Sequence, residues 1–559
     1  MHPVRPCRAA WLLGAWLAWT ATWVSAQTTT SPTATREVPP TASASDDAEL
    51  ALQRALDLER QYKWAAAIEV YEDALQHWPA RTEFRHRLRL CEIHSKLVRR
   101  YQDKSFNAVL LKLPRDKALG LYDELLDRIA THYVEPVAME PLLRRGFDNL
   151  EVALRDPAFL QANAPGAEAA RVLWLRDAYR KQRSMVKARD HAEAKLQVAA
   201  ACDLGQKALG VQPAAVALEF TFGACDALDD YSSYLTPDKL DDLYAMIDGN
   251  FVGLGVELKL DDQGLLLVGV IRGGPAADAG LQIGDKVTHV NGRAVRGLGL
   301  DEAAGKLQGA EHTSVTIIVL HANGSSQTLT LVRRPIEVQS VAQARIVDST
   351  SGVGYIQLTG FQKSSTEELR RAIANLNKQG MRYLVLDLRG NPGGLLNISV
   401  EIAEGFLDNG VVVSTRGRAP GQTSTYQAHA AAIWRMPMAV LIDHDSASAS
   451  EILAGALKDH RRAMVLGERS YGKGSVQSIF PLRSAPAGLK LTTAKFYSPQ
   501  NRPYSEQGVS PDVPVAVHLT AKPADPDAPP PSVDFGDPTR DPVLSEAIRQ
   551  ARHQVSKAG

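Results

Sequence analysis

The sequence is poor in cysteine and lacks recognisable metal-ligand patterns. It has four cysteines in 559 residues, and Cys7 lies in an N-terminal stretch that we expect to be removed. Cys91, Cys202 and Cys225 remain, an odd number without CxxC spacing. They could form one disulfide, but they do not predict a disulfide-built scaffold or a zinc site. No HExxH segment and no Walker-type phosphate loop occurs, so we expect no metal and no cofactor.

The chain also lacks net charge and, after its N-terminus, any long apolar run. It carries 63 acidic and 63 basic side chains, so no global electrostatic field would attract nucleic acid. A membrane-spanning helix takes ~20 consecutive apolar residues. No stretch of the mature chain is that long and apolar. We therefore expect neither a nucleic-acid partner nor an integral membrane segment in the mature protein.

The N-terminus has the order of features typical of a secretory signal peptide. Arg5 and Arg8 precede an apolar run over residues 9–24, and Ala26 closes a pair of small residues. This order predicts export, with cleavage after Ala26. A transmembrane anchor is the alternative, but the apolar run is shorter than the ~20 residues that a span requires. We expect residues 1–26 to be removed and the mature protein to be secreted.

Three segments of different character follow before residue 249. Residues 27–46 are rich in Ser, Thr and Pro and predict a disordered linker. Residues 47–104 have a helical pattern, and the part at 62–79 resembles one tetratricopeptide-type hairpin. Such a hairpin could pack on the next segment or bind a protein partner, and the sequence leaves both open. Residues 105–248 predict further amphipathic helices.

Short apolar runs broken by glycine replace the helical pattern after residue 249. They predict strands at 251–258, 265–271 and 314–320 and a helix at 301–308. Between them lies the segment GPAADAGLQIGDKVTHVNG at 274–292. In this order the elements resemble a PDZ domain, which we assign to residues 249–335.

The PDZ resemblance implies a site for peptide C-termini. Backbone N–H groups of a glycine turn would receive the terminal carboxylate, and a strand edge beside the helix would pair with the peptide. The residues implied as peptide-binding are Gly253, Leu254, Gly255 and Val256. A β-rich module that binds no peptide is the alternative.

Strand and helix patterns alternate from about residue 352 onward. Continuous apolar runs predict buried strands at 354–358, 383–388, 439–442 and 463–466, with helices near 365–379, 395–407 and 450–458 between them. This alternation predicts a layered α/β core over residues 336–520. Residues 521–559 predict a proline-rich linker followed by a C-terminal helix. The whole chain is therefore expected to be a multidomain α+β protein.

The loop GNPGG at 390–394 resembles the serine loop of chymotrypsin-like proteases, with proline in place of the serine. A better nucleophile candidate is Ser448, in the segment SASASEI that joins a buried strand to a helix. At a helix N-terminus, backbone N–H groups and the helix dipole can stabilise a developing oxyanion. The segment also fits a capping box, in which Ser448 only caps the helix and Glu451 bonds back.

His444 offers a second arrangement, because it stands between Asp443 and Asp445 and close to Ser448. A serine, histidine and aspartate triad is defined by geometry, however, and neighbouring positions at a strand end cannot readily point at one another. We therefore prefer a base from elsewhere in the chain.

Three motifs occur in the order DLRGNPGG, SASASEI and GKGSVQ behind the PDZ-like region. Together they resemble the carboxy-terminal processing proteases, the tail-specific peptidases of family S41. The resemblance implies a ClpP/crotonase-like peptidase core, with Ser448 as nucleophile, Lys473 as general base and Gln477 as the residue that positions the lysine. It also implies an oxyanion hole formed by backbone N–H groups of Ala449, Gly393 and Gly394.

A role as general base requires Lys473 to have a lowered pKa. A free lysine has a pKa near 10.4, so it must be desolvated until its pKa approaches about 7–8 before it can act as a base. The glycines on either side of Lys473 allow the backbone to approach closely. We expect a secreted, periplasmic serine endopeptidase that recognises apolar C-terminal tails. The alternative is an inactive PDZ- and repeat-bearing scaffold that binds tails without cutting.

Overall fold

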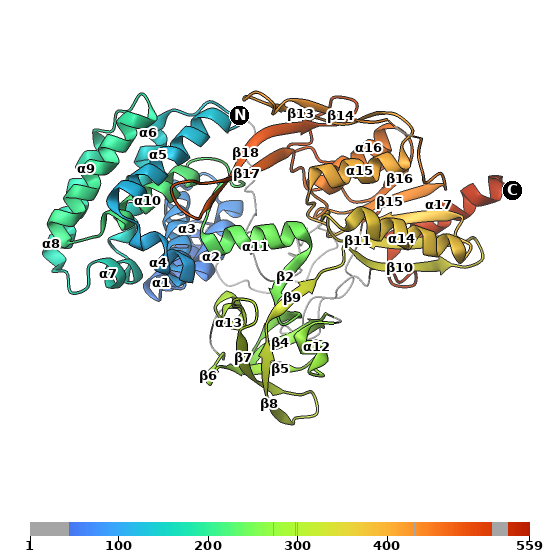
Figure 1. The fold of residues 1–559 in the computed structure, drawn as a ribbon, viewed down its shortest axis with the longest axis horizontal. Coiled ribbons are helices and arrows are strands. Elements are labelled where there is room, and N and C mark those ends of the chain that lie inside the picture. Colours follow the sequence, from blue (N-terminus) through green and yellow to red (C-terminus); the bar gives the residue numbers. More distant parts are fainter. Residues whose placement is uncertain are drawn as a thin grey trace, which may run out of the picture. The chain divides into compact units, whose positions relative to one another are not determined.

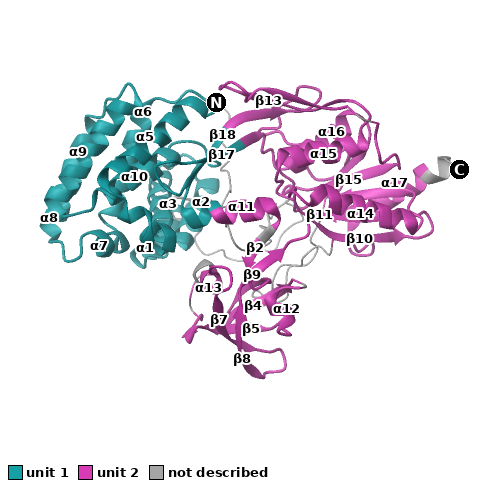
Figure 2. Ribbon diagram, in the orientation of Figure 1, with its two compact units in different colours: residues 1–11, 22–240, 477–492 teal, residues 12–21, 241–476, 493–559 magenta. Residues whose placement is uncertain are grey.

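The computed structural model describes residues 44–271, 273–296, 298, 300–429, 431–516 and 535–558. The predicted signal peptide and linker residues 27–43 lie outside these ranges. Within them the chain divides into two compact units (Figure 2). The first unit holds residues 44–240 and 477–492, and the second holds residues 241–476 and 493–558.

The first unit begins with a helical hairpin followed by a longer helix (Figure 1). The three elements are α1 (Ala44–Arg60), α2 (Trp64–His77) and α3 (Thr82–Gln102). Small, aliphatic and aromatic side chains fill their common core: Ala48, Leu52, Ala55, Ala67, Tyr71, Ala74, Phe84 and Cys91. The helices predicted for residues 47–104 are confirmed, whereas membership of the tetratricopeptide class stays a prediction.

Charged side chains tie α3 to the helices that follow it. His94 Nδ1 lies 2.9 Å from Asp156 Oδ2, and Arg100 donates to Glu219 at 2.6 Å with both side chains buried. A buried charge is tolerated when it has a partner of opposite sign. The hairpin segment therefore packs, through α3, against the helices that follow it.

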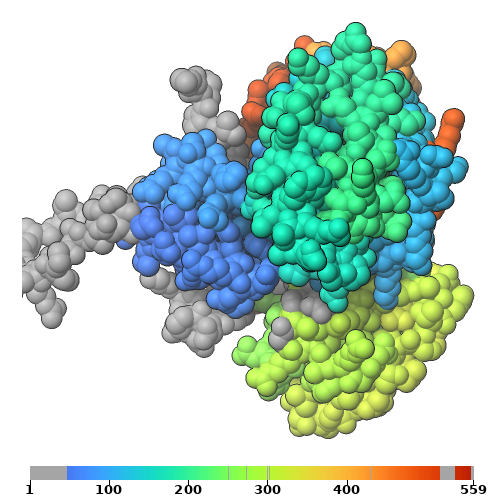
Figure 3. Space-filling view, turned by 90° about the vertical axis from the view of Figure 1, so that its left-hand side faces the viewer, coloured from blue at the N-terminus to red at the C-terminus, as the bar shows by residue number. Residues whose placement is uncertain are grey.

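The predicted helical region at 105–248 is confirmed. Its elements are α4 (Lys104–Ala108), η1 (Leu110–Lys112), α5 (Arg115–His132), α6 (Met139–Ala153), α7 (Pro157–Asn163), α8 (Ala169–Ser184), α9 (His191–Leu209), α10 (Pro213–Asp226) and α11 (Pro237–Asp248). The blue-to-green surface in Figure 3 is one face of the unit that most of these helices form.

Helix α10 is buried almost all round because nearly every residue in it is apolar or small. Its Gly223 lies against Gly146 of α6, where an added Cβ would come within 2.6 Å of the Gly146 backbone. Two glycines thus allow the two helices to cross at close range. Within the described ranges, every helix is either too short or too polar to be a candidate membrane span.

A segment from late in the sequence completes the first unit. Residues 477–492 comprise most of β17 (Ser475–Pro481) and the first half of β18 (Gly488–Tyr497), which pair with each other. β18 also pairs antiparallel with β1 (Ser233–Leu235), and Leu482, Leu489 and Leu491 enter the helical core. We assigned residues 336–520 to the peptidase core, but residues 477–492 within that range pack with the first unit instead.

The PDZ-like region contains a sheet in the order β3-β4-β5-β7-β8, with β6 beside β5, and a separate pair, β2 and β9. Its elements are β2 (Asn250–Gly253), β3 (Val256–Asp261), β4 (Gly264–Val270), α12 (Pro275–Asp278), β5 (Lys286–Val290), β6 (Arg293–Ala294), α13 (Leu300–Leu307), β7 (Ser314–Leu320), β8 (Ser326–Val332) and β9 (Arg334–Glu337). Asn291 and Gly292 both have positive φ, as a tight hairpin turn between β5 and β6 requires. The strand predicted at 251–258 is divided in two by the glycine turn.

The main sheet of the second unit has the order β10-β11-β12-β15-β16-β19. All neighbours pair in parallel except β10 and β11. The strands are β10 (Val341–Asp348), β11 (Val353–Leu358), β12 (Tyr383–Asp387), β15 (Met438–Ile442), β16 (Met464–Gly467) and β19 (Val513–Pro514). The four strands predicted between 354 and 466 are all present.

Both faces of this sheet are buried. Leu384 and Leu386 share one core with α14 (Ser365–Lys378), α15 (Leu396–Phe406) and α16 (Ala449–Asp459). Tyr383 and Val385 point to the other face, where they share a core with α17 (Pro542–Ala558). Burial on both sides explains why the strands read as continuous apolar runs. The layered α/β core is confirmed, while its ClpP/crotonase-like character stays a prediction.

Several strands from residue 341 onward were not predicted, among them β10, β17, β18, β19 and the pair described next. β13 (Gly410–Gly417) pairs with β14 (Ser424–Ala428) and with the end of β18. The C-terminal helix was predicted, but its role was not: it forms a layer of the core.

Candidate active site

Ser448 stands between β15 and α16 in an unusual backbone conformation. Its φ and ψ are 58° and −114°, whereas a residue that only caps a helix has an extended backbone. A non-glycine residue held in a sparsely populated region costs about 1–3 kcal/mol, and such residues cluster at functional sites. Ser448 is half-buried and lies at the N-terminus of α16. At this position a substrate can reach the residue, and the helix presents the positive end of its dipole.

The two neighbouring serines are fully buried and already engaged. Ser446 Oγ donates to the Leu388 carbonyl at 2.8 Å and accepts from the Asp443 amide at 3.0 Å. Ser450 Oγ donates to the Asn391 carbonyl at 2.9 Å. These hydroxyls support the backbone of the turn and of the GNPGG loop.

Glu451 connects the serine turn to the lysine loop. Its Oε2 accepts from the backbone amides of Ser448 at 2.7 Å and Lys473 at 2.9 Å. Its Oε1 accepts from the Gly472 amide at 2.7 Å and from Ser470 Oγ at 2.6 Å. The structure thus brings Ser448 and Lys473 together, because their amides meet at one carboxylate oxygen.

The Glu451 carboxylate is completely buried. Burial raises its pKa, while the four hydrogen bonds that it accepts act in the opposite direction. The sequence pattern predicts Glu451 only as half of a capping box. The capping box is present in the structure, with Glu451 accepting from the Ser448 amide, but the same carboxylate also holds the loop of Lys473.

Lys473 is buried, with an exposed fraction of 8%, and lies in a loop that packs tightly on neighbouring backbone. A Cβ added at Gly474 would come within 2.1 Å of the Ser505 amide nitrogen, and one at Gly472 within 3.1 Å of the Glu506 backbone. Gly472 also has a φ of +91°. The close backbone approach that the glycines predicted is therefore present.

The GNPGG loop packs against the serine turn. Gly393 has a φ of +102°, and an added Cβ would lie 2.7 Å from the Ala447 carbonyl oxygen and 2.8 Å from the Ala449 amide nitrogen. The Ala447 amide also donates to the Asn391 carbonyl at 3.0 Å. The Gly393 amide donates to Asn391 Oδ1 at 2.9 Å, so this donor is already used inside the loop.

Gly394 has a φ of +146°, and an added Cβ would come within 2.3 Å of the Phe361 carbonyl oxygen. The backbone on either side of Gly394 is hydrogen-bonded to Phe361. The Phe361 amide donates to the Gly393 carbonyl, and the Leu395 amide donates to the Phe361 carbonyl. Only glycine fits this position.

The two remaining candidates lie in different surroundings. Gln477 is in β17, in the part of the chain that belongs to the first unit, and its Nε2 donates to Thr492 Oγ1 at 3.4 Å. Its role in positioning Lys473 stays a prediction. The exposed ring of His444 has its nitrogens 3.4 Å from Asp445 and 3.6 Å from Glu468, so it pairs with surface carboxylates.

The predicted peptide-binding turn lies between β2 and β3. Gly255 has a φ of +78°, and its carbonyl accepts from the Ile271 amide, while the Leu254 carbonyl accepts from the Ala276 amide. Val256 begins β3, which stands at one end of the sheet order and contacts α13. A strand at the end of a sheet is where an added peptide strand can pair.

Comparison with known proteins identifies both of the β-rich regions that follow residue 249. The model of peptidase family S41 matches residues 352–515, and that of the PDZ domain matches residues 267–321. A carboxy-terminal-processing protease of Bartonella bacilliformis is 37% identical over 303 residues, which cover 53% of this chain and 68% of that protein. A carboxyl-terminal-processing protease of Synechocystis is 37% identical over 287 residues, covering 50% of this chain and 66% of that protein.

Among solved structures, the photosystem II D1 C-terminal processing protease is 26% identical and covers 72% of this chain and 94% of its own, with a TM-score of 0.39. The match to the Bartonella protein and the S41 and PDZ models agree with the motifs around Ser448 and Lys473. The chain belongs to peptidase family S41, in its carboxy-terminal processing group of serine-type peptidases, and carries a PDZ domain.

Proposed function

We propose that this protein is a secreted endopeptidase that recognises apolar C-terminal tails and cuts peptide bonds with a Ser448–Lys473 dyad. The observation that carries the proposal is the shared Glu451 oxygen, which accepts from the amides of both residues. It is supported by the strained backbone of Ser448, since strain of this kind persists where surrounding contacts enforce it for function.

In this mechanism Lys473 acts first as a base and then as an acid. Its neutral amine takes the proton of the Ser448 hydroxyl as the oxygen attacks the scissile carbonyl carbon. The C–N bond then breaks, and the lysine ammonium returns the proton to the leaving amine. Water hydrolyses the acyl-serine ester by the same proton route. The first step needs the neutral amine, and Lys473 is buried in the structure.

We assign the oxyanion hole to the amides of Ala449 and Gly394. Ala449 is the first residue of α16, where an N–H group and the helix dipole both favour negative charge. The Gly393 N–H already donates to Asn391 Oδ1. Gly393 instead lets the loop approach Ser448 closely, because it has no side chain. Gln477 would hold the lysine amine without adding charge.

The PDZ domain would capture the substrate tail. The turn Gly253-Leu-Gly-Val256 would receive the terminal carboxylate, and the outer edge of β3 would pair with the tail beside α13. Captured chains would then be cut at Ser448. Export, with removal of residues 1–26, would place the enzyme in the periplasm, where it meets secreted and envelope proteins.

The test is to incubate the purified, exported protein with an unstructured substrate that ends in an apolar tail, beside Ser448→Ala. The proposal predicts cleavage by the wild type and none by the variant, with equal tail binding by both. If the wild type binds the tail but leaves the substrate intact, the protein is a tail-binding scaffold and the proposed function is wrong.

A further inference from the structure

Arg389 is a buried cation at the point where β12 gives way to the GNPGG loop. Its exposed fraction is 2%. Nε donates to Asp387 Oδ1 at 2.9 Å and Nη2 donates to Asp387 Oδ2 at 2.6 Å. A buried guanidinium is stable only when carboxylates neutralise it. Asp387, two positions earlier, supplies the first of these.

The second carboxylate comes from Asp541, 152 residues along the chain. Arg389 Nη1 and Nη2 donate to the two oxygens of Asp541 at 2.9 and 2.6 Å, a bidentate pair. Asp541 is fully buried, and it also accepts from the amides of Leu544 and Gly536. The Phe535 ring covers the guanidinium, with its centroid 4.4 Å from Cζ.

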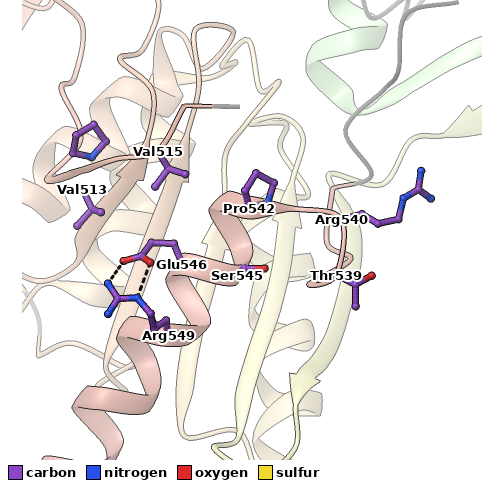
Figure 4. Close-up of a pocket in the computed structure, with 9 residues that line it drawn as sticks. Val513, Val515, Thr539, Arg540, Pro542, Ser545, Glu546 and Arg549 are labelled. Atoms are coloured by element: carbon purple, nitrogen blue, oxygen red, sulfur yellow. Dashed lines mark hydrogen bonds and ion pairs between the residues drawn. The ribbon is translucent and has the colours of Figure 1, made fainter. Parts of the chain in front are cut away.

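Helix α17 fixes Asp541 in place. Val543, Leu544 and Ala547 of this helix are buried in the core formed with the sheet. Figure 4 shows the start of α17 beside β19, with Glu546 and Arg549 joined to each other in an open pocket. Asp541 therefore cannot leave Arg389 unless the first turn of α17 moves, whereas Glu546 serves a separate surface pair.

Arg389 is joined on its other side to the loop that touches Ser448. The next residue, Gly390, has a φ of +68°, and its amide donates to both oxygens of Asp443 at 3.0 and 3.1 Å. The Asn391 carbonyl accepts from the Ala447 amide and from Ser450 Oγ. The GNPGG loop is thus held between the serine turn and the buried Arg389.

We propose that Asp541 is a positioning residue for peptide hydrolysis, acting through Arg389 to fix the GNPGG loop and the Gly394 amide within it. The inference rests on the proposed function, which gives that amide to the oxyanion. Without Asp541 the guanidinium keeps one counter-ion and can reorient toward it. A displacement of about 1 Å at a catalytic group can cost about 10²-fold in rate. The loss should appear in kcat, because the oxyanion exists only in the transition state and intermediate.

The test uses the exported enzyme with all of its domains. Asp541→Asn removes the charge while keeping an oxygen that can accept from the Leu544 amide. We expect its kcat to fall about 10- to 100-fold with KM changed by less than about threefold. Asp541→Glu restores the charge and should recover part of the loss. Glu546→Gln, in the helix α17 that begins directly after Asp541, is the matched control and should keep the wild-type kcat.

Hydrogen exchange gives a readout that does not depend on activity. Amides of residues 389–391 and 393–395 should exchange faster in Asp541→Asn than in the wild type or Glu546→Gln. If Asp541→Asn does not fold, Phe535→Leu replaces it, and we expect a smaller drop in kcat and faster exchange of the same amides. Wild-type kcat and wild-type exchange in whichever variant folds would overturn the proposal. An inactive wild type would instead refute the proposed function, and hydrogen exchange would still test whether Asp541 holds the GNPGG loop through Arg389.

Discussion

Three serines lie close together on one turn, and their contacts predict different results of substitution. Ser448→Ala should lower the cleavage rate by more than about 10³-fold, because the nucleophile is lost. Ser446→Ala and Ser450→Ala each remove a buried hydrogen bond that supports backbone, which costs about 1–3 kcal/mol of stability. They should keep cleavage rates within about tenfold of the wild type. Rates and melting temperatures of the three variants check this, and equal inactivation with equal unfolding would reduce the turn to a structural cap.

Lys473 makes a second prediction at the same scale. Lys473→Arg should lower the cleavage rate by more than about 10³-fold, because a guanidinium stays protonated and cannot accept the serine proton. The backbone bond from residue 473 to Glu451 does not involve the side chain, so folding should be retained. The cleavage rate and the melting temperature are measured together. Substantial activity in a folded Lys473→Arg would remove lysine as the base.

At the scale of elements, α17 should make the fold sensitive to acid. Burial alone would raise the pKa of Asp541, but hydrogen bonds and charge from Arg389 outweigh it and hold that pKa below the usual value. The folded pKa is thus below the unfolded one, which is about 3.9. This stabilisation is fully present above that pH and is lost as the pH falls through the folded value.

We therefore expect the melting temperature of Asp541→Asn to lie below that of the wild type near pH 7 and the difference to shrink below about pH 4. Thermal melts from pH 7 to pH 3 measure it. Asp116 has an exposed side chain in α5, so Asp116→Asn is the control, and its melting temperature should match that of the wild type at every pH. A difference that is the same at every pH would contradict the assignment.

Elements with a strong pattern could be predicted from the sequence, and those whose residues depend on distant partners could not. β12 and β15 were predicted because burial on both faces leaves no polar residue in their interiors. β13 and β14 were missed because only part of their surface is buried and the segment between them is polar and contains glycine and proline. Ser448 and Lys473 could be proposed as a dyad from local motifs, and the structure brings their amides to one Glu451 oxygen. The link from Arg389 to Asp541 had no local signal, because its partners lie 152 residues apart.

At the scale of the whole molecule, tail capture and cleavage should be separable. Amidating the C-terminus of a substrate removes the charge that the PDZ turn would bind, while the scissile bond stays the same. We expect KM to rise about 10-fold or more while kcat at saturation changes less than about threefold. A matched substrate with a free apolar tail is the control. If both are cut at the same rate even at low concentration, the PDZ domain is not a tail receptor.

The central claim is that Ser448 is a nucleophile activated by Lys473, and its most direct measurement is mass-spectrometric mapping of a covalent adduct. A fluorophosphonate, which reacts with activated serines, is added to the purified enzyme and to Lys473→Ala. The account predicts a single adduct on Ser448 in the wild type, together with loss of cleavage, and a labelling rate lowered by more than about 10²-fold in Lys473→Ala. An adduct on a different residue that abolishes cleavage, or equal labelling of Ser448 without Lys473, would contradict it.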